Sequence, residues 1–296
     1  MIHSKSNQRY QIIINAVLLL VTVIMVAPLV LLFMSSVSSE SSLLNNGYSF
    51  WPKEFSMAAY QYILTNGQTI LRAYGVTVIV TIIGTIANLV LSSTAAYALS
   101  IKKLPFRNII SFYVFFTMLF SGGLVPSYLM WSNTFHIKNT IWALIVPNFM
   151  CSAMNIILMR TYFMTSIPEA LYEAAKIDGA SYLYIYHKIV VPMGKPIFVT
   201  VGLFAGLGYW NDWTNGLYYI NDAKLYSIQT LLNKMIQDIQ ALQANAAAAA
   251  SGAAMTIPTV SVRMAIAFVA LAPILVVYPF LQKYFAEGIA MGAVKG

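Results

Sequence analysis

The chain has 296 residues, of which 59% are hydrophobic and only 9% are charged, and its formal net charge is +8. Soluble globular domains usually carry about 25% charged residues, so this composition excludes an ordinary soluble protein. It predicts an all-α, polytopic membrane protein with one domain over residues 1–296, because the chain shows neither an internal repeat nor a hinge.

Six apolar stretches are long enough to cross a hydrocarbon core, which takes roughly 20 helical residues. In chain order they lie near residues 12–34, 73–101, 109–130, 141–159, 197–217 and 264–282. The first is preceded by basic residues, as a signal peptide would be. We nevertheless expect a retained span, because about 22 apolar residues exceed the usual hydrophobic region of a signal peptide.

The positive charge is distributed as in a membrane protein rather than as in a nucleic-acid-binding protein. With the N-terminus inside, eleven of the 17 Lys and Arg residues fall in cytoplasmic segments and six in outer segments, although the outer loops are longer. This asymmetry follows the positive-inside rule and places both termini and the segment 166–195 in the cytoplasm. We therefore expect no nucleic acid among the partners.

Apart from Asp212, which lies near the end of the fifth stretch, the six stretches contain no Asp, Glu, Lys, Arg or His. Ion-coupled carriers commonly place ionisable groups at mid-membrane, so a stand-alone secondary carrier is disfavoured. A membrane enzyme acting on lipid-linked glycans would need paired carboxylates or a metal motif at the interface, and only Asp212 is near one. The single Cys151 and three scattered histidines give no disulfide framework and no metal site.

The segment 166–195 is the most charged stretch between two spans, and its local chemistry predicts a helix, a glycine turn and a second helix. Ser166 and Glu169 have the spacing of a capping box, which predicts Ser166 as the N-cap. The helix then runs to about Asp178. Gly179 suits the left-handed position that follows a helix.

The second helix of this segment is predicted to begin after Ser181, to run through Lys188 and to end at Pro192. On the first helix a small apolar face is formed by Ala170, Leu171, Ala174 and Ala175, with Glu169, Glu173 and Lys176 around it. Small side chains let another protein approach the backbone closely. The alternative is a helix that lies on lipid, but such helices usually have larger apolar residues and a basic polar face.

The order Glu173-Ala174-Ala175, three residues, Gly179, nine residues, Ile189 and Pro192 resembles the signature cytoplasmic loop of ABC-importer permeases. The one departure is Val191, which stands where the pattern has Leu. The resemblance implies a coupling helix that fits a cleft on a nucleotide-binding subunit and transmits its closure. The residues that it assigns to ATPase coupling are Glu169, Glu173, Ala174, Ala175, Asp178, Gly179, Ile189 and Pro192.

The likeness extends over nearly the whole chain. The segments 120–126, 139–144 and 283–296 look like the oligosaccharide branch of carbohydrate permeases, with the maltose-system inner-membrane subunits as more distant relatives. The resemblance implies a type I ABC-importer permease fold in the plasma membrane of a prokaryote. It also implies a second permease, two ATPase subunits that carry ATP and Mg²⁺, and an extracellular solute-binding protein. This chain itself would bind no cofactor, and a solute other than a sugar remains the alternative.

Two sets of residues are candidates for the substrate path. Trp210, Asn211, Asp212 and Trp213 combine aromatic faces with polar groups, which suits sugars but is also typical of an aromatic belt at the membrane interface. The amides Asn88, Asn148 and Asn155 lie within predicted spans, where they should either bond to another helix or face a polar path.

Overall fold

The computed structural model describes residues 5–65, 67–147, 149–244 and 260–293. These residues are almost entirely helical, and the one β contact recorded among them is an isolated antiparallel bridge between Ser38 and Phe55. The chain divides into two compact units, each described here by itself. Unit 1 comprises Met1–Ile70 and Leu232–Pro273, and unit 2 comprises Leu71–Leu231 and Ile274–Gly296.

In unit 1 a carboxylate of one helix accepts hydrogen bonds from the N-terminus of another. Its helices are α1 Lys5–Ser36, α2 Glu40–Asn46, α3 Ala58–Thr65, the later part of α14 Ile228–Ala244 and the first part of α16 Val260–Ala293. The Glu40 carboxylate accepts hydrogen bonds from the Val260 and Ser261 backbone N–H groups, each at 2.9 Å, and from the Ser261 hydroxyl at 2.8 Å. A negative charge at a helix N-terminus is favourable, so α2 fixes where α16 begins.

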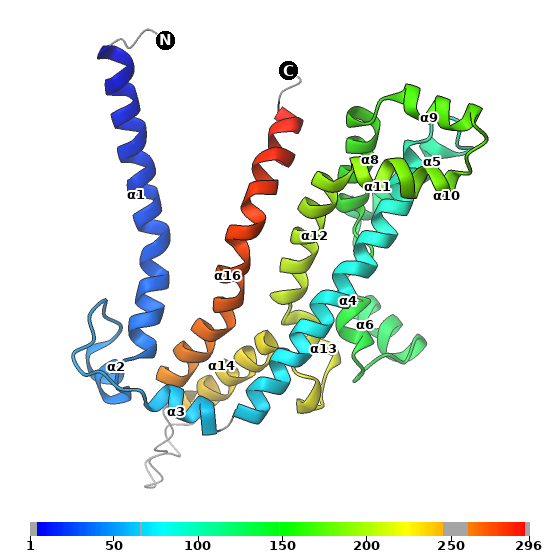
Figure 1. Ribbon diagram of the computed structural model, residues 1–296. Helices are drawn as coiled ribbons and strands as arrows, with labels where there is room; N and C mark the ends of the chain where they lie inside the picture. The colour runs from blue at the N-terminus through cyan, green and yellow to red at the C-terminus, as the bar shows by residue number, and fades with distance from the viewer. Residues whose placement is uncertain (1–4, 66, 148, 245–259, 294–296) are drawn as a thin grey trace. The chain divides into compact units, whose positions relative to one another are not determined.

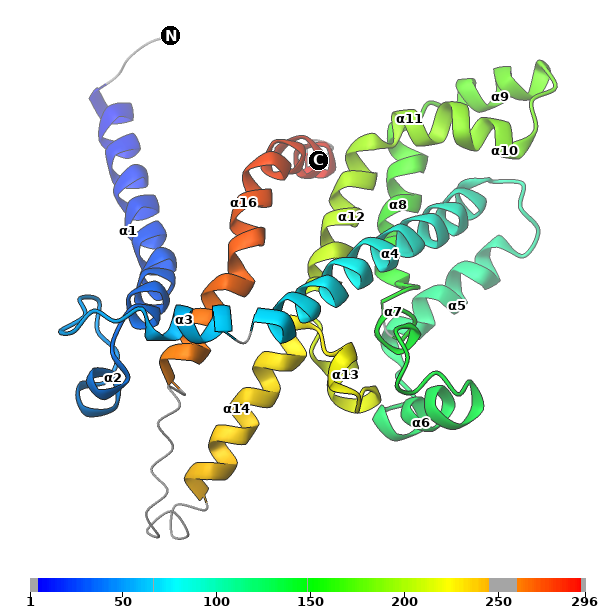
Figure 2. The same ribbon diagram turned by 60° about the horizontal axis from the view of Figure 1, so that its bottom comes forward.

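Unit 2 holds the candidate site. Its remaining elements are α4 Gly67–Ser100, α5 Arg107–Leu119, α6 Leu124–Leu129, the π turn η1 Met130–Thr134, α7 Trp142–Ile145, α8 Ala153–Ser166, α9 Glu169–Ile177, α10 Tyr182–Ile185, the π turn η2 Tyr186–Val190, α11 Val191–Met193, α12 Lys195–Trp210, α13 Thr214–Tyr219 and the 3₁₀ turn η3 Ala223–Leu225. Figures 1 and 2 both show α9, α10 and α11 at one end of this unit, beside the end of α4, and α6 and α13 at the other.

Glycines let α4 and α12 approach each other closely in unit 2. The Tyr209 ring lies where a side chain on Gly84 would have to be, and its hydroxyl donates a 2.8 Å hydrogen bond to the Ile145 carbonyl. Further along, Leu89 packs over Gly202. The ring of a buried tyrosine thus replaces the Cβ that another residue would need at position 84.

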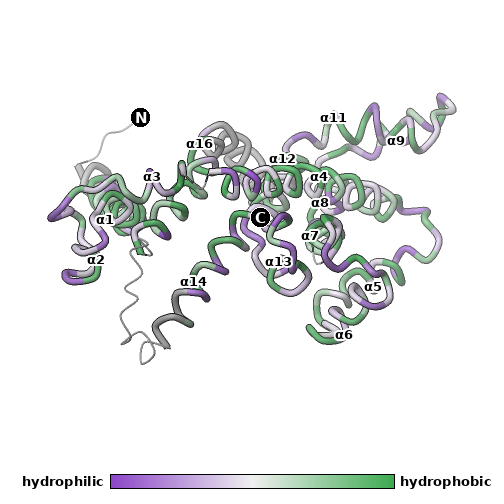
Figure 3. The backbone as a smooth tube through the Cα atoms, turned by 90° about the horizontal axis from the view of Figure 1, so that it is seen from below, coloured by the Kyte–Doolittle hydropathy of each residue, from purple (hydrophilic) through white to green (hydrophobic). Residues whose placement is uncertain are grey.

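The predicted span at 12–34 falls inside the long helix α1, and the span at 73–101 falls inside α4 except for its last residue. Figure 3 shows hydrophobic residues along α1 and hydrophilic residues in the loop next to α2. The predicted span at 264–282 falls inside α16. By length and apolar composition, two described helices can cross a membrane, Tyr10–Ser36 and Gly67–Ser100.

The predicted span at 109–130 is not one continuous helix. The chain leaves helix α5 at Phe120, and the pair α5 and α6 with its π turn is bent by 110°. The cause is Ser121-Gly122-Gly123, where Gly123 takes a φ of +86° that a helix does not allow. If this pair and the similarly bent α10–α12 stretch each count as one span, the number of candidate spans rises from two to four.

The other two predicted spans are also interrupted. The stretch at 141–159 divides into α7 and α8, since Ser152 caps a new helix with its hydroxyl 3.4 Å from the Asn155 backbone N–H. The stretch at 197–217 divides into α12 and α13 at Asn211–Trp213. Local caps therefore start new helices within stretches that the apolar composition alone would have made continuous.

Candidate functional site

Helix α9 begins two residues later than the capping-box spacing predicts. Ser166 is the last residue of α8, Ile167 is extended (φ −103°, ψ 116°), and Pro168 is the N-cap residue of α9. The prediction of Ser166 as N-cap is wrong because a residue before proline is driven out of the helical region. Ile167 therefore cannot form the first turn that the box requires, and Glu169 is free to pair elsewhere.

The end of α9 follows the prediction. Gly179 has a φ of +78°, and its N–H donates to the Lys176 carbonyl at 3.1 Å. The next N–H, of Ala180, donates back to Ala175 at 2.9 Å. This left-handed glycine closure reverses the chain within two residues and brings α10 alongside α9. The exposed Asp178 occupies the C-cap position.

The second helical stretch starts as predicted and ends differently. The Ser181 hydroxyl accepts a 3.3 Å hydrogen bond from the Tyr184 N–H and so caps α10. The stretch does not stop at Pro192 but continues through the π turn η2 into α11 and breaks at Gly194. In the π turn the Val191 N–H bonds to Tyr186, five residues back. A widened turn accommodates a proline ring that would collide with the carbonyl of a regular α-helix.

The inner side of the α9–α11 stretch is anchored on α4. The Ser93 and Tyr186 hydroxyls lie 2.6 Å apart and are buried. The Tyr97 ring stacks on Tyr172 of α9 at 6.4 Å and contacts Tyr186 at 5.6 Å. Burial raises the pKa of Tyr172 to about 12, so this hydroxyl stays neutral at physiological pH. The predicted coupling residues Ala175 and Ile189 pack against the same core and so help to hold the stretch on α4.

The outer side of the same stretch leaves apolar side chains in the open. Ile177 is 86% exposed and Leu183 is 71% exposed. They continue a surface whose members are Ala170, Leu171, Ala174, Ile177, Tyr182, Leu183 and Tyr184, all exposed. We call this set the docking surface. Sequence reasoning missed its larger members, although the spacing of Ala170, Ala174 and Ile177 already places them on one helical face.

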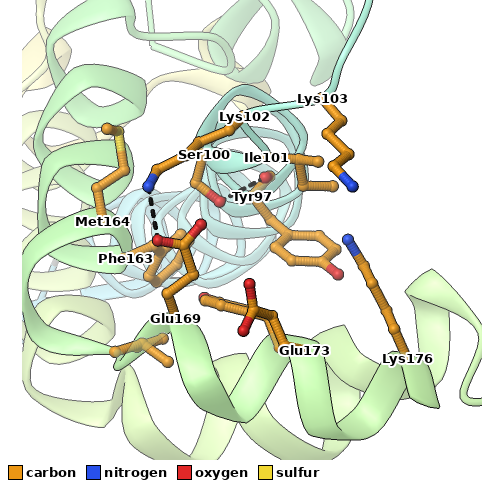
Figure 4. A pocket seen from close by; sticks show the side chains of 12 residues that line it. Tyr97, Ser100, Ile101, Lys102, Lys103, Phe163, Met164, Glu169, Glu173 and Lys176 are labelled. Atoms are coloured by element: carbon orange, nitrogen blue, oxygen red, sulfur yellow. Dashed lines mark hydrogen bonds and ion pairs between the residues drawn. The ribbon is translucent and has the colours of Figure 1, made fainter. Parts of the chain in front are cut away.

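A pocket of about 250 Å³ lies between α9 and the end of α4 (Figure 4). Across it, the Lys102 ammonium pairs with the Glu169 carboxylate at 2.6 Å. Glu173 also lines the pocket, one turn further along α9. The Lys102–Glu169 pair could not be read from the sequence, because its members are 67 residues apart.

The structure separates the residues of the predicted segment 210–213. Asp212 is buried, and its Oδ1 accepts the N–H groups of Thr214 at 3.0 Å and Asn215 at 3.2 Å, so that it caps α13. Trp210 is partly buried, with its ring 6.5 Å from that of Tyr74. The side chains of this segment that are exposed are those of Asn211 and Trp213.

The amides inside the predicted spans bond between helices. Asn155 of α8 donates to Asn88 of α4 at 3.0 Å, and Asn88 donates to the Phe149 carbonyl at 2.6 Å. Of the two roles left open for these amides, helix–helix bonding is confirmed for Asn88 and Asn155. Asn148 lies outside the described residues.

Comparison with known proteins gives a consistent result. Residues 88–291 match the family described as binding-protein-dependent transport system inner membrane component. The polygalacturonan/rhamnogalacturonan transport system permease protein YtcP of Bacillus subtilis is 36% identical over 98% of this chain and 99% of its own length. Protein LplC of the same organism is 35% identical over 92% of this chain and 90% of its own length.

A solved structure supports the fold. The bacterial ABC transporter involved in the import of the acidic polysaccharide alginate includes a chain with a TM-score of 0.80 and 28% identity, covering 96% of this chain and 99% of that one. The helical architecture described above is thus the type I ABC-importer permease fold. The chain belongs to the family of inner membrane components of binding-protein-dependent transport systems.

Proposed function

We propose that this chain is the permease subunit of an ATP-driven importer for an oligosaccharide or a related glycoside, delivered by an extracellular solute-binding protein. The observation that carries the proposal is the docking surface on α9 and α10, exposed on one side and anchored to α4 on the other. An apolar surface of this kind, next to the exposed carboxylates of Glu173 and Asp178, is suited to a protein partner.

The geometry explains how α9 would act. Small side chains at Ala170 and Ala174 leave the helix backbone accessible, and Glu173 offers a charge at the edge of the same surface. An ATPase subunit seated here would push α9, and the Tyr172–Tyr97 stack would pass the displacement to α4. The permease turns between inward- and outward-facing states because ATP and solute favour different states.

The proposed assembly contains a second permease, two ATPase subunits with ATP and Mg²⁺, and the solute-binding protein, with six spans in this chain and both termini in the cytoplasm. The family description supports an inner membrane component that works with a binding protein. The charge asymmetry of the loops supports the orientation.

The proposed solute class rests on the relatives. Their names include polygalacturonan/rhamnogalacturonan, arabinooligosaccharides and diacetylchitobiose. In this chain Asn211 and Trp213 are the residues of the predicted substrate segment that are exposed, and we assign the sugar contact to them. Asp212 supports the segment by capping α13.

The test is uptake by the whole importer. The tagged chain, copurified with its partners and reconstituted in vesicles, should take up oligogalacturonides or arabino-oligosaccharides only when ATP is supplied. Glu173→Lys should abolish this uptake while the permease stays in the membrane. Lys224→Glu, an exposed charge reversal at the 3₁₀ turn η3, is the matched control and should transport normally.

Two results would contradict the proposal. One is a chain that purifies without an ATPase and still moves solute after reconstitution, which would make it a carrier. The other is normal ATP-driven uptake by a correctly assembled Glu173→Lys variant, which would remove α9 from the coupling path.

A further inference from the structure

Helix α9 meets the end of α4 at two kinds of contact with an open pocket beside them. One is the Tyr172–Tyr97 ring stack, which is partly buried. The other is the Lys102–Glu169 ion pair, whose side chains are 65% and 57% exposed. Figure 4 shows the ammonium and the carboxylate directed toward each other across the pocket mouth.

The ion pair adds a link between the first residue of α9 and the turn that follows α4. Lys102 lies in the turn between α4 and α5, and Glu169 is the first residue of α9. Ile167 and Pro168, just before it, are extended and form a joint between α8 and α9. The pair thus holds the end of α9 that adjoins this joint.

We propose that Lys102 and Glu169 are positioning residues of the transport cycle, which tie α9 to the α4–α5 turn so that both move together. The inference rests on the proposed function, since it assumes that an ATPase displaces α9. The two glutamates on this face of α9 then have different tasks. Glu169 is held inside the chain, whereas for Glu173 no ion pair is recorded within the described residues, and it is available to the ATPase.

The pair is unsuited to a purely stabilising role. Exposed ion pairs add little to folding stability, because water and salt screen them and two long side chains must be ordered. A tie between moving parts needs no large folding energy. Such a tie needs only to favour one arrangement of α9 and the α4–α5 turn over others. The Lys102–Glu169 ion pair can do this while the pocket beside it stays open.

The test uses charge reversal and its rescue in the reconstituted importer with its partner subunits. Lys102→Glu and Glu169→Lys should each lower the oligosaccharide transported per ATP hydrolysed by roughly five-fold, a typical lower value for coupling between sites. The double variant Lys102→Glu with Glu169→Lys should restore the ratio. The neighbouring Lys103→Glu is the matched control, because no carboxylate partner is recorded for Lys103 in the described part of the chain.

A distance measurement tests the tie without relying on transport. Spin labels on Lys103→Cys and Lys176→Cys, in a Cys151→Ala background, lie on opposite walls of the pocket. Their distance should stay the same with and without trapped ATP and vanadate, and should become state-dependent or broader with Lys102→Glu. A distance unaffected by Lys102→Glu, or a double variant as impaired as the single ones, would overturn the tie. Absence of ATP-driven uptake in the unmodified assembly would instead contradict the proposed function.

Discussion

The α9–α11 stretch and the segment 209–215 contain similar residues and use them in opposite ways. Both combine at least one carboxylate with several aromatic side chains. In the segment 209–215 the Asp212 carboxylate is buried, and one of its oxygens is taken by two backbone N–H groups. In the α9–α11 stretch Glu169 and Glu173 are exposed. A carboxylate used by the backbone shapes the fold, whereas one at the surface is available for partners and for movement.

The largest effect is expected from Gly84→Val, which acts on the segment 209–215. The Tyr209 ring occupies the space that the new side chain needs. Tyr209 is only a few residues before Asp212 in the chain, so displacing the ring should also displace the segment 209–215. We expect a loss of about 3 kcal/mol or more, the upper end of overpacking costs in well-packed interiors, and little folded protein on size-exclusion chromatography.

The matched control is Gly75→Val in the same helix. A side chain at Gly75 meets nothing within 4 Å. The control should therefore behave as the unmodified protein. Equal yields of folded protein from the two variants would mean that α4 and α12 do not meet at Gly84.

The Asp212 variants sharpen the comparison at the carboxylate itself. Asp212→Ala removes the cap of α13 and should lower stability by about 1–2 kcal/mol, read as a lower thermal midpoint in detergent. Asp212→Asn keeps an oxygen that can accept the same N–H groups, and should retain most of the midpoint and the uptake. An Asp212→Asn protein that is fully stable but does not transport would show that the charge contacts solute.

The smallest effect is expected from Ser181→Ala in the α9–α11 stretch. The Ser181 hydroxyl caps only α10, a four-residue helix, so its loss should cost about 1 kcal/mol or less and remain local. Hydrogen exchange should quicken for the α10 amides with little change in the overall melting curve. A global loss of stability comparable to that of Asp212→Ala would mean that α10 is part of the folding core rather than of its edge.

Local chemistry predicted much of the α9–α11 stretch. The glycine reversal at Gly179 and the cap at Ser181 are both confirmed, because each depends on two to four neighbouring residues. The pairing of amides between helices was one of the two roles that the sequence left open. The partner of each amide did not follow, because it lies on another helix.

The errors arose where a nearby residue overruled the pattern or where the contact was distant. Pro168 displaced the predicted cap, and Gly123 broke a span that composition alone made continuous. The burial of Asp212 could not be anticipated, since the same residue at the same spacing could equally have faced a sugar. The Lys102–Glu169 pair joins loops that only the folded chain brings together.

The anchoring of α9–α11 on α4 has a consequence for engineering. The loop is joined in sequence to α8 and α12, yet Tyr186 bonds to Ser93 and Tyr172 stacks on Tyr97. A chimera that exchanges only residues 166–195 would therefore separate these side chains from the α4 residues that they contact. The transplantable module is discontinuous, and a graft of this loop has to include the last two turns of α4.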